Sequence, residues 1–177
     1  VISVHNYPSM EATLLKAIDY ASEMHQFQRR KDDFGTPYIN HPIRVANSIR
    51  EIGQIDDVVV WVCALLHDVV EDTPAKYDDI VCRFGTKIAN IVMEVTDDKS
   101  LPKVDRKKYQ VFHAGSMSYE AKLVKLADKL DNISDLRTHP PKGWSEDIIN
   151  GYFIWSSKVV DQMRGTNTGL EEALDAI

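Results

Sequence analysis

The sequence has few cysteines and no long apolar run, and both absences limit what the protein can be. Cys63 and Cys82 are the only cysteines among its 177 residues, too few for the disulfide framework of a small secreted domain. The longest apolar stretch, Val58–Leu66, is well short of the roughly 20 residues that a membrane-spanning helix needs. We therefore expect no membrane partner. Because Cys63 lies in an apolar run, we also expect a buried, reduced thiol and a cytoplasmic location.

Positive charge is also scarce. The chain has 21 basic and 27 acidic residues, which give a formal net charge of -6. A protein that binds a nucleic-acid backbone non-specifically needs a basic face, so we expect no nucleic-acid partner. An anionic ligand has to be bound by a local basic patch instead. The composition, 44% hydrophobic and 27% charged, is typical of a folded globular domain.

Apolar residues recur at helical spacing along most of the chain, and the alternation typical of strands is nearly absent. The run Val58–Leu66 is also compatible with a buried strand, since periodicity cannot distinguish the two in a uniformly apolar segment. We predict helices over Met10–Gln28, from His41-Pro42 to Gly53, from Asp56 or Asp57 to about Glu71, after Thr73-Pro74 to Gly85, over Ile88–Val95, over Lys103–His113, over Tyr119–Leu136, from Ser145 to about Arg164, and from Asn167 or Thr168 onwards.

Because nearly every segment has helical periodicity, the predicted fold class is all-α. Because the linkers between the segments are short, we expect a single compact bundle of about eight to ten helices. We expect residues 1–177 to form one domain, with a core over about 10–164 and a helical appendage at 165–177.

The end of the central apolar segment carries a concentrated group of imidazole and carboxylate side chains. On a helix, residues four apart share one face, which places His67 over Glu71 and Asp68 over Asp72. Uncompensated charges at a buried helix end cost several kcal/mol each, and a divalent metal is one way to neutralise them. Mixed nitrogen and oxygen ligands suit Mn, Fe, Zn or Mg. The alternative is a solvated helix end with ordinary acidic side chains.

Other segments offer further candidates. Asp128 and Asn132 share a polar face of the helix predicted over Tyr119–Leu136. That face is either wet, or it supplies a carboxylate ligand from Asp128 and a substrate contact from Asn132. His41 stands at a helix start, where a histidine more often caps or hydrogen-bonds than binds metal. The loop at Arg29–Lys31 leads directly to His41 and offers cations for an anionic ligand.

Together these segments resemble a known family, the HD-domain metal-dependent phosphohydrolases, in which the order is H…HD…D. Here the order is supplied by His41, then His67-Asp68, then Asp128. Three longer strings resemble the hydrolase domain of the RelA/SpoT alarmone enzymes: TPYINHP at 36–42, ALLHDVVEDT at 64–73 and VKLADKLDN at 124–132. Shorter matches at 95–99, 143–145 and 164–167 extend the likeness to the stand-alone form found in animals.

The resemblance implies removal of the 3′-pyrophosphate from guanosine 3′,5′-bis(diphosphate) (ppGpp) with Mn²⁺ as the cofactor. It also allows removal of the 2′-phosphate of NADPH, and it allows a homo-oligomer. The residues that it implies are the metal ligands His41, His67, Asp68 and Asp128, the catalytic pair Glu71 and Asp72, and the substrate-binding residues Arg30, Lys31, Asn132 and Tyr152.

The division of labour within the catalytic pair stays open. Glu71 or Asp72 would orient or deprotonate a water molecule and later protonate the leaving group, and neighbouring carboxylates can share a proton. Two other functions remain as alternatives: an HD-domain phosphatase acting on another nucleotide, and a nucleotide sensor that kept the pocket without turnover.

Overall fold

The computed structural model describes residues 9–32 and 34–177, and over these residues it contains ten α-helices. The all-α class is confirmed, because the described residues form no strand, only one isolated antiparallel bridge between Arg29 and Pro37. The helices are α1 Met10–Met24, α2 Asn40–Glu51, α3 Val58–Leu66, α4 Val69–Asp72, α5 Tyr77–Phe84, α6 Thr86–Val95, α7 Lys103–Ala114, α8 Tyr119–Thr138, α9 Glu146–Asp161 and α10 Thr168–Asp175.

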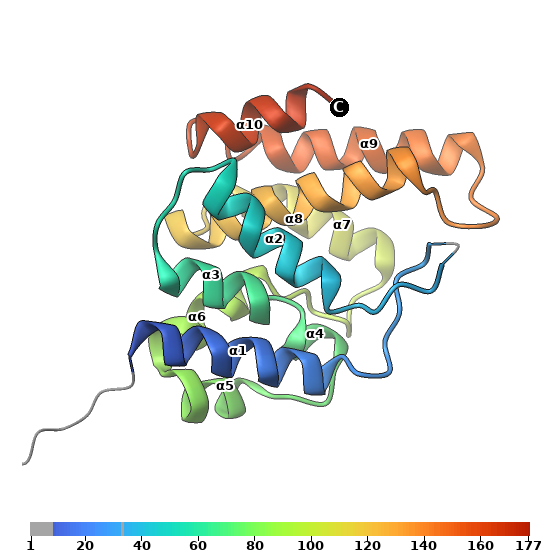
Figure 1. The fold of residues 1–177 in the computed structure, drawn as a ribbon. Coiled ribbons are helices and arrows are strands. Elements are labelled where there is room, and N and C mark those ends of the chain that lie inside the picture. The colour runs from blue at the N-terminus through green and yellow to red at the C-terminus, as the bar shows by residue number, and fades with distance from the viewer. Residues whose placement is uncertain (1–8, 33) are drawn as a thin grey trace, which may run out of the picture.

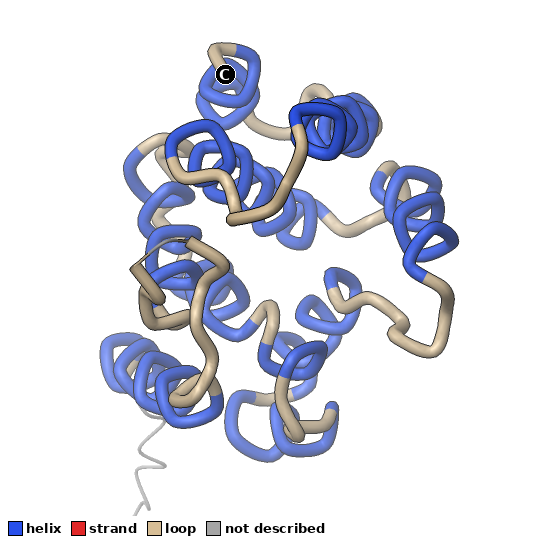
Figure 2. Tube along the Cα trace, turned by 90° about the vertical axis from the view of Figure 1, so that its right-hand side faces the viewer, coloured by secondary structure: helices blue, strands red, loops and turns tan. Residues whose placement is uncertain are grey.

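The helices α3 and α8 form the centre of the molecule. Helix α3 packs against α1, α2, α6 and α8, while α8 also packs against α9 and α10. In Figure 1, α2, α3 and α8 lie between α1 with α5 on one side and α9 with α10 on the other. Six of the nine residues of α3 are buried, so the apolar segment forms a central helix and the alternative of a buried strand is wrong. Figure 2 shows the same helices, joined by loops, in a view turned by 90°.

Side-chain caps fix the helix starts that the sequence predicted. The Asp57 carboxylate accepts a hydrogen bond from Val59 N at 2.8 Å at the start of α3. Ser118 and Ser145 cap α8 and α9 in the same manner, and Asn167 caps α10. Each side chain satisfies a backbone N–H that the first helical turn would otherwise leave unpaired.

Several boundaries differ from the prediction. The helix predicted from Asp57 to about Glu71 is interrupted after Leu66, and α4 begins only at Val69. Thr73 does not start the next helix, because its hydroxyl donates to Val69 O at 2.6 Å and so completes the end of α4. Helix α5 begins at Tyr77 instead. The first helix also ends at Met24 rather than Gln28, where the chain turns into the loop that follows.

This loop between α1 and α2 folds back on itself. Arg30 N donates to Thr36 O at 2.8 Å, and Tyr38 N donates to Gln28 O at 3.0 Å. The pairing brings Arg30 and Tyr38 near the start of α2 and thus near His41.

The C-terminal helix joins the common core. Leu170 and Leu174 of α10 belong to the same buried apolar cluster as α3 and α8, and Asn167 Nδ2 donates to Gly53 O at the end of α2. The domain limits and the division at 165 stay a prediction. Among the helices of the described residues, none combines the length and the apolar character that crossing a bilayer requires.

Candidate metal centre and adjoining cavities

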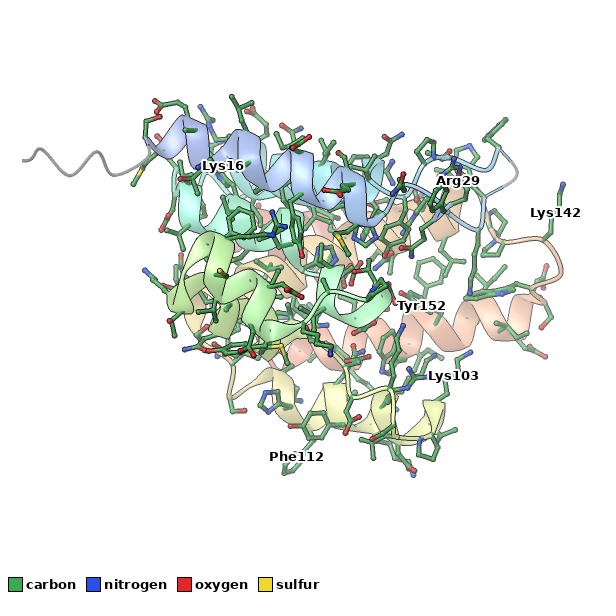
Figure 3. All side chains as sticks on the ribbon, turned by 90° about the horizontal axis from the view of Figure 1, so that it is seen from below. Lys16, Arg29, Lys103, Phe112, Lys142 and Tyr152 are labelled. Atoms are coloured by element: carbon green, nitrogen blue, oxygen red, sulfur yellow. The ribbon has the colours of Figure 1, made fainter. Side chains whose placement is uncertain are left out.

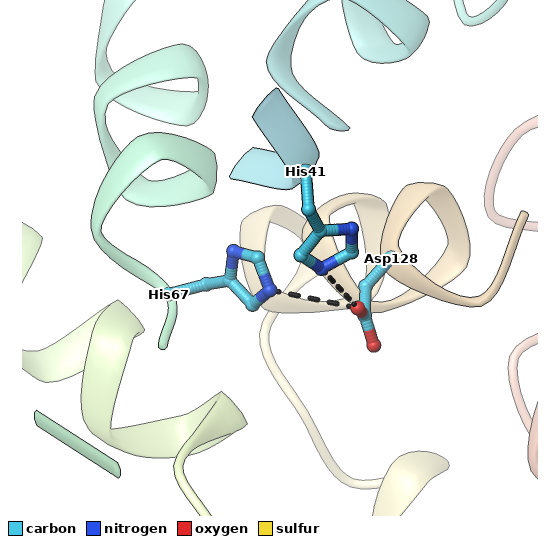
Figure 4. A group of neighbouring side chains, drawn as sticks. All are labelled: His41, His67 and Asp128. Atoms are coloured by element: carbon cyan, nitrogen blue, oxygen red, sulfur yellow. Dashed lines mark ion pairs between the residues drawn. The ribbon is translucent and has the colours of Figure 1, made fainter. Parts of the chain in front are cut away.

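Three distant segments of the chain converge at one buried point. His41 comes from the start of α2, His67 from the break after α3, and Asp128 from the middle of α8. Asp128 Oδ1 lies 3.1 Å from His41 Nε2 and 3.5 Å from His67 Nε2. Figure 4 shows both imidazole rings pointing at this carboxylate. One ligand atom from each residue lies within 4.8 Å of the others, and all three residues are buried, so the group could hold a metal ion.

The hydrogen bonds at the far side of each ring prepare both histidines as ligands. His67 Nδ1 lies 2.6 Å from Ala64 O, and since a carbonyl oxygen only accepts, Nδ1 carries the proton. His41 Nδ1 lies 2.6 Å from Asp131 Oδ2. Because a carboxylate oxygen accepts, Nδ1 of His41 carries the proton as well. In the neutral ring the Nε2 lone pair then faces the shared centre. Over the described residues, His67 Nε2 is buried and makes no hydrogen bond of good geometry. Its nearest polar neighbours are carboxylate oxygens, as expected of a ligand atom in a cation site.

Asp68 completes the set of four predicted ligands. Its Oδ2 lies 2.9 Å from His67 Nε2 and 3.7 Å from His41 Nε2, and it accepts a hydrogen bond from the Tyr38 hydroxyl at 2.5 Å. Burial opposes protonation of His67, but Asp68 and Asp128 outweigh burial and raise the pKa of that imidazole. Nitrogen and oxygen donors with this surplus of carboxylate charge fit a divalent cation.

The predicted catalytic pair lies on α4, one turn beyond the break. Glu71 Oε1 accepts a hydrogen bond from Asp97 N at 2.6 Å, and Asp72 forms an ion pair with Lys99. Burial, together with the charge of Asp68, raises the pKa of Glu71 to about 7. Asp68, Glu71 and Asp72 also bring one carboxylate oxygen each within 4.8 Å of one another. Near neutral pH, Glu71 therefore populates both protonation states.

Two cavities open beside this centre. The outer one, of about 370 Å³, is lined by Arg29–Asp32, by His139 and Trp144, and by Tyr152 among others. The inner one, of about 190 Å³, contains the carboxylates of Asp68, Glu71 and Asp128. Tyr38, Asp72, Asn132 and Tyr152 line both cavities. The two spaces therefore adjoin, and together they have the size of a small-molecule site. Figure 3 shows Arg29 and Tyr152 on the same side of the molecule.

All four predicted substrate contacts line these cavities. Arg30 donates from Nη2 to Asn132 Oδ1 at 3.2 Å, and Asn132 Nδ2 donates to Asp128 Oδ1 at 2.7 Å. Lys31 is exposed on the wall of the outer cavity. Tyr152 reaches the site from α9 and is flanked by Trp144 and Trp155, with ring centroids 6.0 and 5.2 Å away. The structure thus brings every predicted site residue into one region.

Several other residues of this region were not predicted as site residues. The polar face of α8 is not wet, since Lys125 and Lys129 are both buried in the inner cavity. Lys129 Nζ lies 4.0 Å from the centre of the Trp155 ring, and burial lowers its pKa. Asp131 was passed over as well, although its position three residues after Asp128 is the helical spacing of a neighbour on the same face.

The chain is similar to known proteins over most of its length. The HD-domain family model matches residues 17–148, and the chain therefore belongs to the HD-domain family. It is similar to the guanosine-3′,5′-bis(diphosphate) 3′-pyrophosphohydrolases named MESH1. The protein from Danio rerio is 51% identical, over 96% of this chain and 94% of its own length. The protein from Homo sapiens is 52% identical, over 94% and 93%.

A solved structure has the same fold. It is described as a metazoan ortholog of SpoT that hydrolyses ppGpp, and it is 48% identical to this chain. The two superpose with a TM-score of 0.92, over 97% of this chain and 95% of that one. The fold is thus shared over nearly the whole chain and is not confined to the metal centre.

Proposed function

We propose that this protein is a divalent-metal-dependent phosphohydrolase that removes the 3′-pyrophosphate of ppGpp, with Mn²⁺ as the metal. The observation that carries the proposal is the convergence of His41, His67, Asp68 and Asp128 from three segments beside a cavity of nucleotide size. The similarity to hydrolases of ppGpp supports the choice of substrate. The reaction adds water across the bond between phosphorus and the 3′-oxygen, and it yields GDP and pyrophosphate.

His41, His67, Asp68 and Asp128 would hold the metal. When bound, a divalent cation supplies Lewis acidity, which lowers the pKa of a water molecule towards neutrality and offsets charge on the phosphoryl group. The protein fixes the two imidazoles for this task through Ala64 O and Asp131. The Tyr38 hydroxyl donates to Oδ2 of Asp68, the same oxygen that lies 2.9 Å from His67 Nε2, and so holds this carboxylate at the centre.

Glu71 would act as the proton acceptor and donor. It stands in the inner cavity next to Asp68, and its pKa near 7 suits a group that takes a proton from water and returns it to the leaving group. The hydrogen bond from Asp97 N orients the carboxylate. Asp72 borders both cavities and forms an ion pair with Lys99. Together, Asp72 and Lys99 would position the water molecule and the phosphoryl group.

Cations on the outer wall would bind the phosphates of the substrate. Arg30 and Lys31 face the outer cavity, and the transition state of phosphoryl transfer spreads negative charge over oxygens that such cations stabilise. Asn132 links Arg30 to Asp128 and would contact the sugar or phosphate at the junction of the two cavities. Tyr152 would contact the nucleoside from the opposite helix.

A metal-replacement assay with a ligand variant tests this function. Protein stripped with a chelator is supplied with Mn²⁺ and ppGpp, and released pyrophosphate is measured. We expect release by the wild type and a loss of more than about 100-fold in Asp128→Ala, together with loss of bound metal, because even outer partners of metal ligands are worth 10- to 100-fold. Asp56→Ala, a change at a side chain that is 84% exposed, is the matched control and should keep full activity. Absence of pyrophosphate release by metal-loaded wild type refutes the proposal.

The same sample distinguishes the remaining alternatives. Parallel reactions with NADPH, with phosphate release as the readout, test the 2′-phosphatase activity. Reactions with Zn²⁺ and Mg²⁺ test the choice of Mn²⁺. A nucleotide sensor would bind ppGpp without turnover, and it would keep its affinity in Asp128→Ala if binding needs no metal.

A further inference from the structure

A chain of ion pairs runs behind the candidate metal centre. His41 Nδ1 lies 2.6 Å from Asp131 Oδ2, on the side of the ring that faces away from the centre. Asp131 is held in turn by Arg44, whose Nε donates to Oδ1 at 2.6 Å and whose Nη2 donates to Oδ2 at 3.0 Å. This two-point contact of a guanidinium with a carboxylate fixes orientation as well as distance.

The chain continues to the outer cavity. Arg44 Nη2 also donates to Asp135 Oδ2 at 3.0 Å. The same oxygen of Asp135 accepts hydrogen bonds from Arg30 Nη2 at 2.7 Å and Arg30 Nε at 3.2 Å. One carboxylate oxygen therefore joins the two guanidinium groups. Arg30 also contacts Asn132, and Asn132 contacts Asp128. Because Asp128 lies beside His41, these contacts form a closed ring of side chains that begins and ends at His41.

The sequence builds this ring from two helix faces. Asp128, Asp131, Asn132 and Asp135 recur at spacings of three, four and seven on α8, so they lie along one stripe. His41 and Arg44 are three apart on α2, which packs directly against α8. The side chain of Asp131 is only 8% exposed, whereas that of Arg44 is 41% exposed. Arg44 is thus the member of the ring on its solvent-exposed side, and it lines neither of the two cavities.

We propose that Arg44 is a positioning residue that couples the metal ligand His41 to Arg30 through Asp131 and Asp135. The inference rests on the proposed function, in which Arg30 binds the substrate phosphates. Arg44 holds Asp131 so that His41 keeps the ring orientation needed for a ligand, and it holds Asp135 so that Arg30 faces the outer cavity. Removal of Arg44 weakens both metal binding and substrate binding, although Arg44 contacts neither.

A surface ion pair with a role in stability alone gives a different outcome. Loss of an ion pair that acts on stability alone lowers the free energy of unfolding but changes neither the metal dissociation constant nor the Michaelis constant of the folded protein. The decisive measurements are therefore the two affinities, taken separately. Binding of Mn²⁺ to chelator-stripped protein is measured by competition with a chromogenic chelator, in the absence of nucleotide. The KM and kcat for ppGpp are then measured at saturating Mn²⁺.

The test uses Arg44→Gln with two companions. In Arg44→Gln we expect Mn²⁺ affinity to fall by about 10-fold or more, the size typical of outer partners of metal ligands, and KM for ppGpp to rise at saturating metal. Arg44→Lys should recover part of one affinity only, because an ammonium group cannot bridge two carboxylates as the planar fork does. Arg50→Gln removes an exposed arginine from the same helix, away from Asp131 and Asp135, and should leave both constants unchanged.

Asp135→Asn separates the two halves of the coupling. It weakens the link to Arg30 and leaves the contact between Arg44 and Asp131 in place, so KM should rise while Mn²⁺ affinity stays within about twofold. If Arg44→Gln does not fold, Asp135→Asn still tests the link to Arg30: a KM equal to that of the wild type overturns the proposal. The proposal is overturned if Arg44→Gln keeps both constants, or if only one of them changes. A wild type that binds Mn²⁺ but releases no pyrophosphate refutes the proposed function instead, and the metal affinity of Arg44→Gln still tests the half that concerns His41.

Discussion

Substitution of Glu71 by glutamine should change the pH dependence of stability in a calculable way. Burial raises the pKa of Glu71 to about 7 from an ordinary value of 4.5. Between these two pH values the folded protein binds more protons than the unfolded chain, so this residue makes the free energy of unfolding fall as the pH rises. A difference of one pKa unit corresponds to 1.36 kcal/mol. Glu71 therefore costs about 2 to 3 kcal/mol of stability between pH 5 and pH 8.

Glutamine has the shape of the protonated acid and keeps an oxygen that accepts from Asp97 N, but it does not titrate. The free energies of unfolding of metal-free wild type and Glu71→Gln should thus be nearly equal at pH 5. At pH 8 the variant should be more stable by about 2 to 3 kcal/mol. Urea unfolding of both proteins, with a chelator present and circular dichroism as the readout, measures this difference.

A matched substitution at the surface provides the control. Glu172→Gln on α10 is exposed, and its difference from wild type should stay within about 0.5 kcal/mol at both pH values. Parallel pH profiles for wild type and Glu71→Gln would refute the reasoning, because they would mean that Glu71 ionises as readily in the folded protein as in the unfolded chain.

Three further predictions follow from packing, thiol exposure and metal binding. Gly169→Ala should lower the free energy of unfolding by more than 1 kcal/mol, because the added Cβ would lie 2.3 Å from Ile52 O. Gly151→Ala, with nothing within 4 Å of its Cβ, should instead raise it by about 0.5 to 1 kcal/mol, as is usual for alanine replacing glycine within a helix; urea unfolding compares the two. Native protein should react with a thiol reagent at one cysteine and denatured protein at two, since Cys82 is exposed while burial raises the pKa of Cys63 to about 12. Mn²⁺ at 100 times its dissociation constant should raise the free energy of unfolding by about 2.7 kcal/mol, and a chelator should reverse the accompanying rise in melting temperature; equal melting curves with and without Mn²⁺ would contradict a metal site.

Local signals were sufficient to predict most of the helices. Ser118, Ser145 and Asn167 cap helices where the sequence places them, because capping depends on contacts within three residues. The interruption at His67 and Asp68 carries no such signal, since neither glycine nor proline marks it. On an uninterrupted helix, adjacent side chains point about 100° apart. The break allows both to face one centre, and this requirement arises from the site rather than from helix propensity.

The candidate site was predictable as a set of residues but not as a network. Asp131 and Asp135 lie at helical spacing from Asp128, yet their partner Arg44 is about 90 residues away in sequence. That contact depends on how α2 packs against α8, which periodicity cannot give. Likewise, the helical pattern places Lys129 on a polar face, and a side chain on such a face can be exposed to solvent. Only the position of Trp155 on α9 shows that the ammonium group is enclosed.

The lining of the inner cavity implies an order of assembly. Five acidic residues, Asp68, Glu71, Asp72, Asp97 and Asp128, face two lysines there. A polyphosphate that enters this cavity before the metal ion is repelled by the excess of negative charge on its lining. This repulsion is stronger inside the protein than in water, because the dielectric constant is lower. We expect productive encounters to begin with the cation, which reverses the local potential before the anion enters. Preincubation with metal should then shorten the lag before turnover, whereas preincubation with nucleotide should leave that lag unchanged.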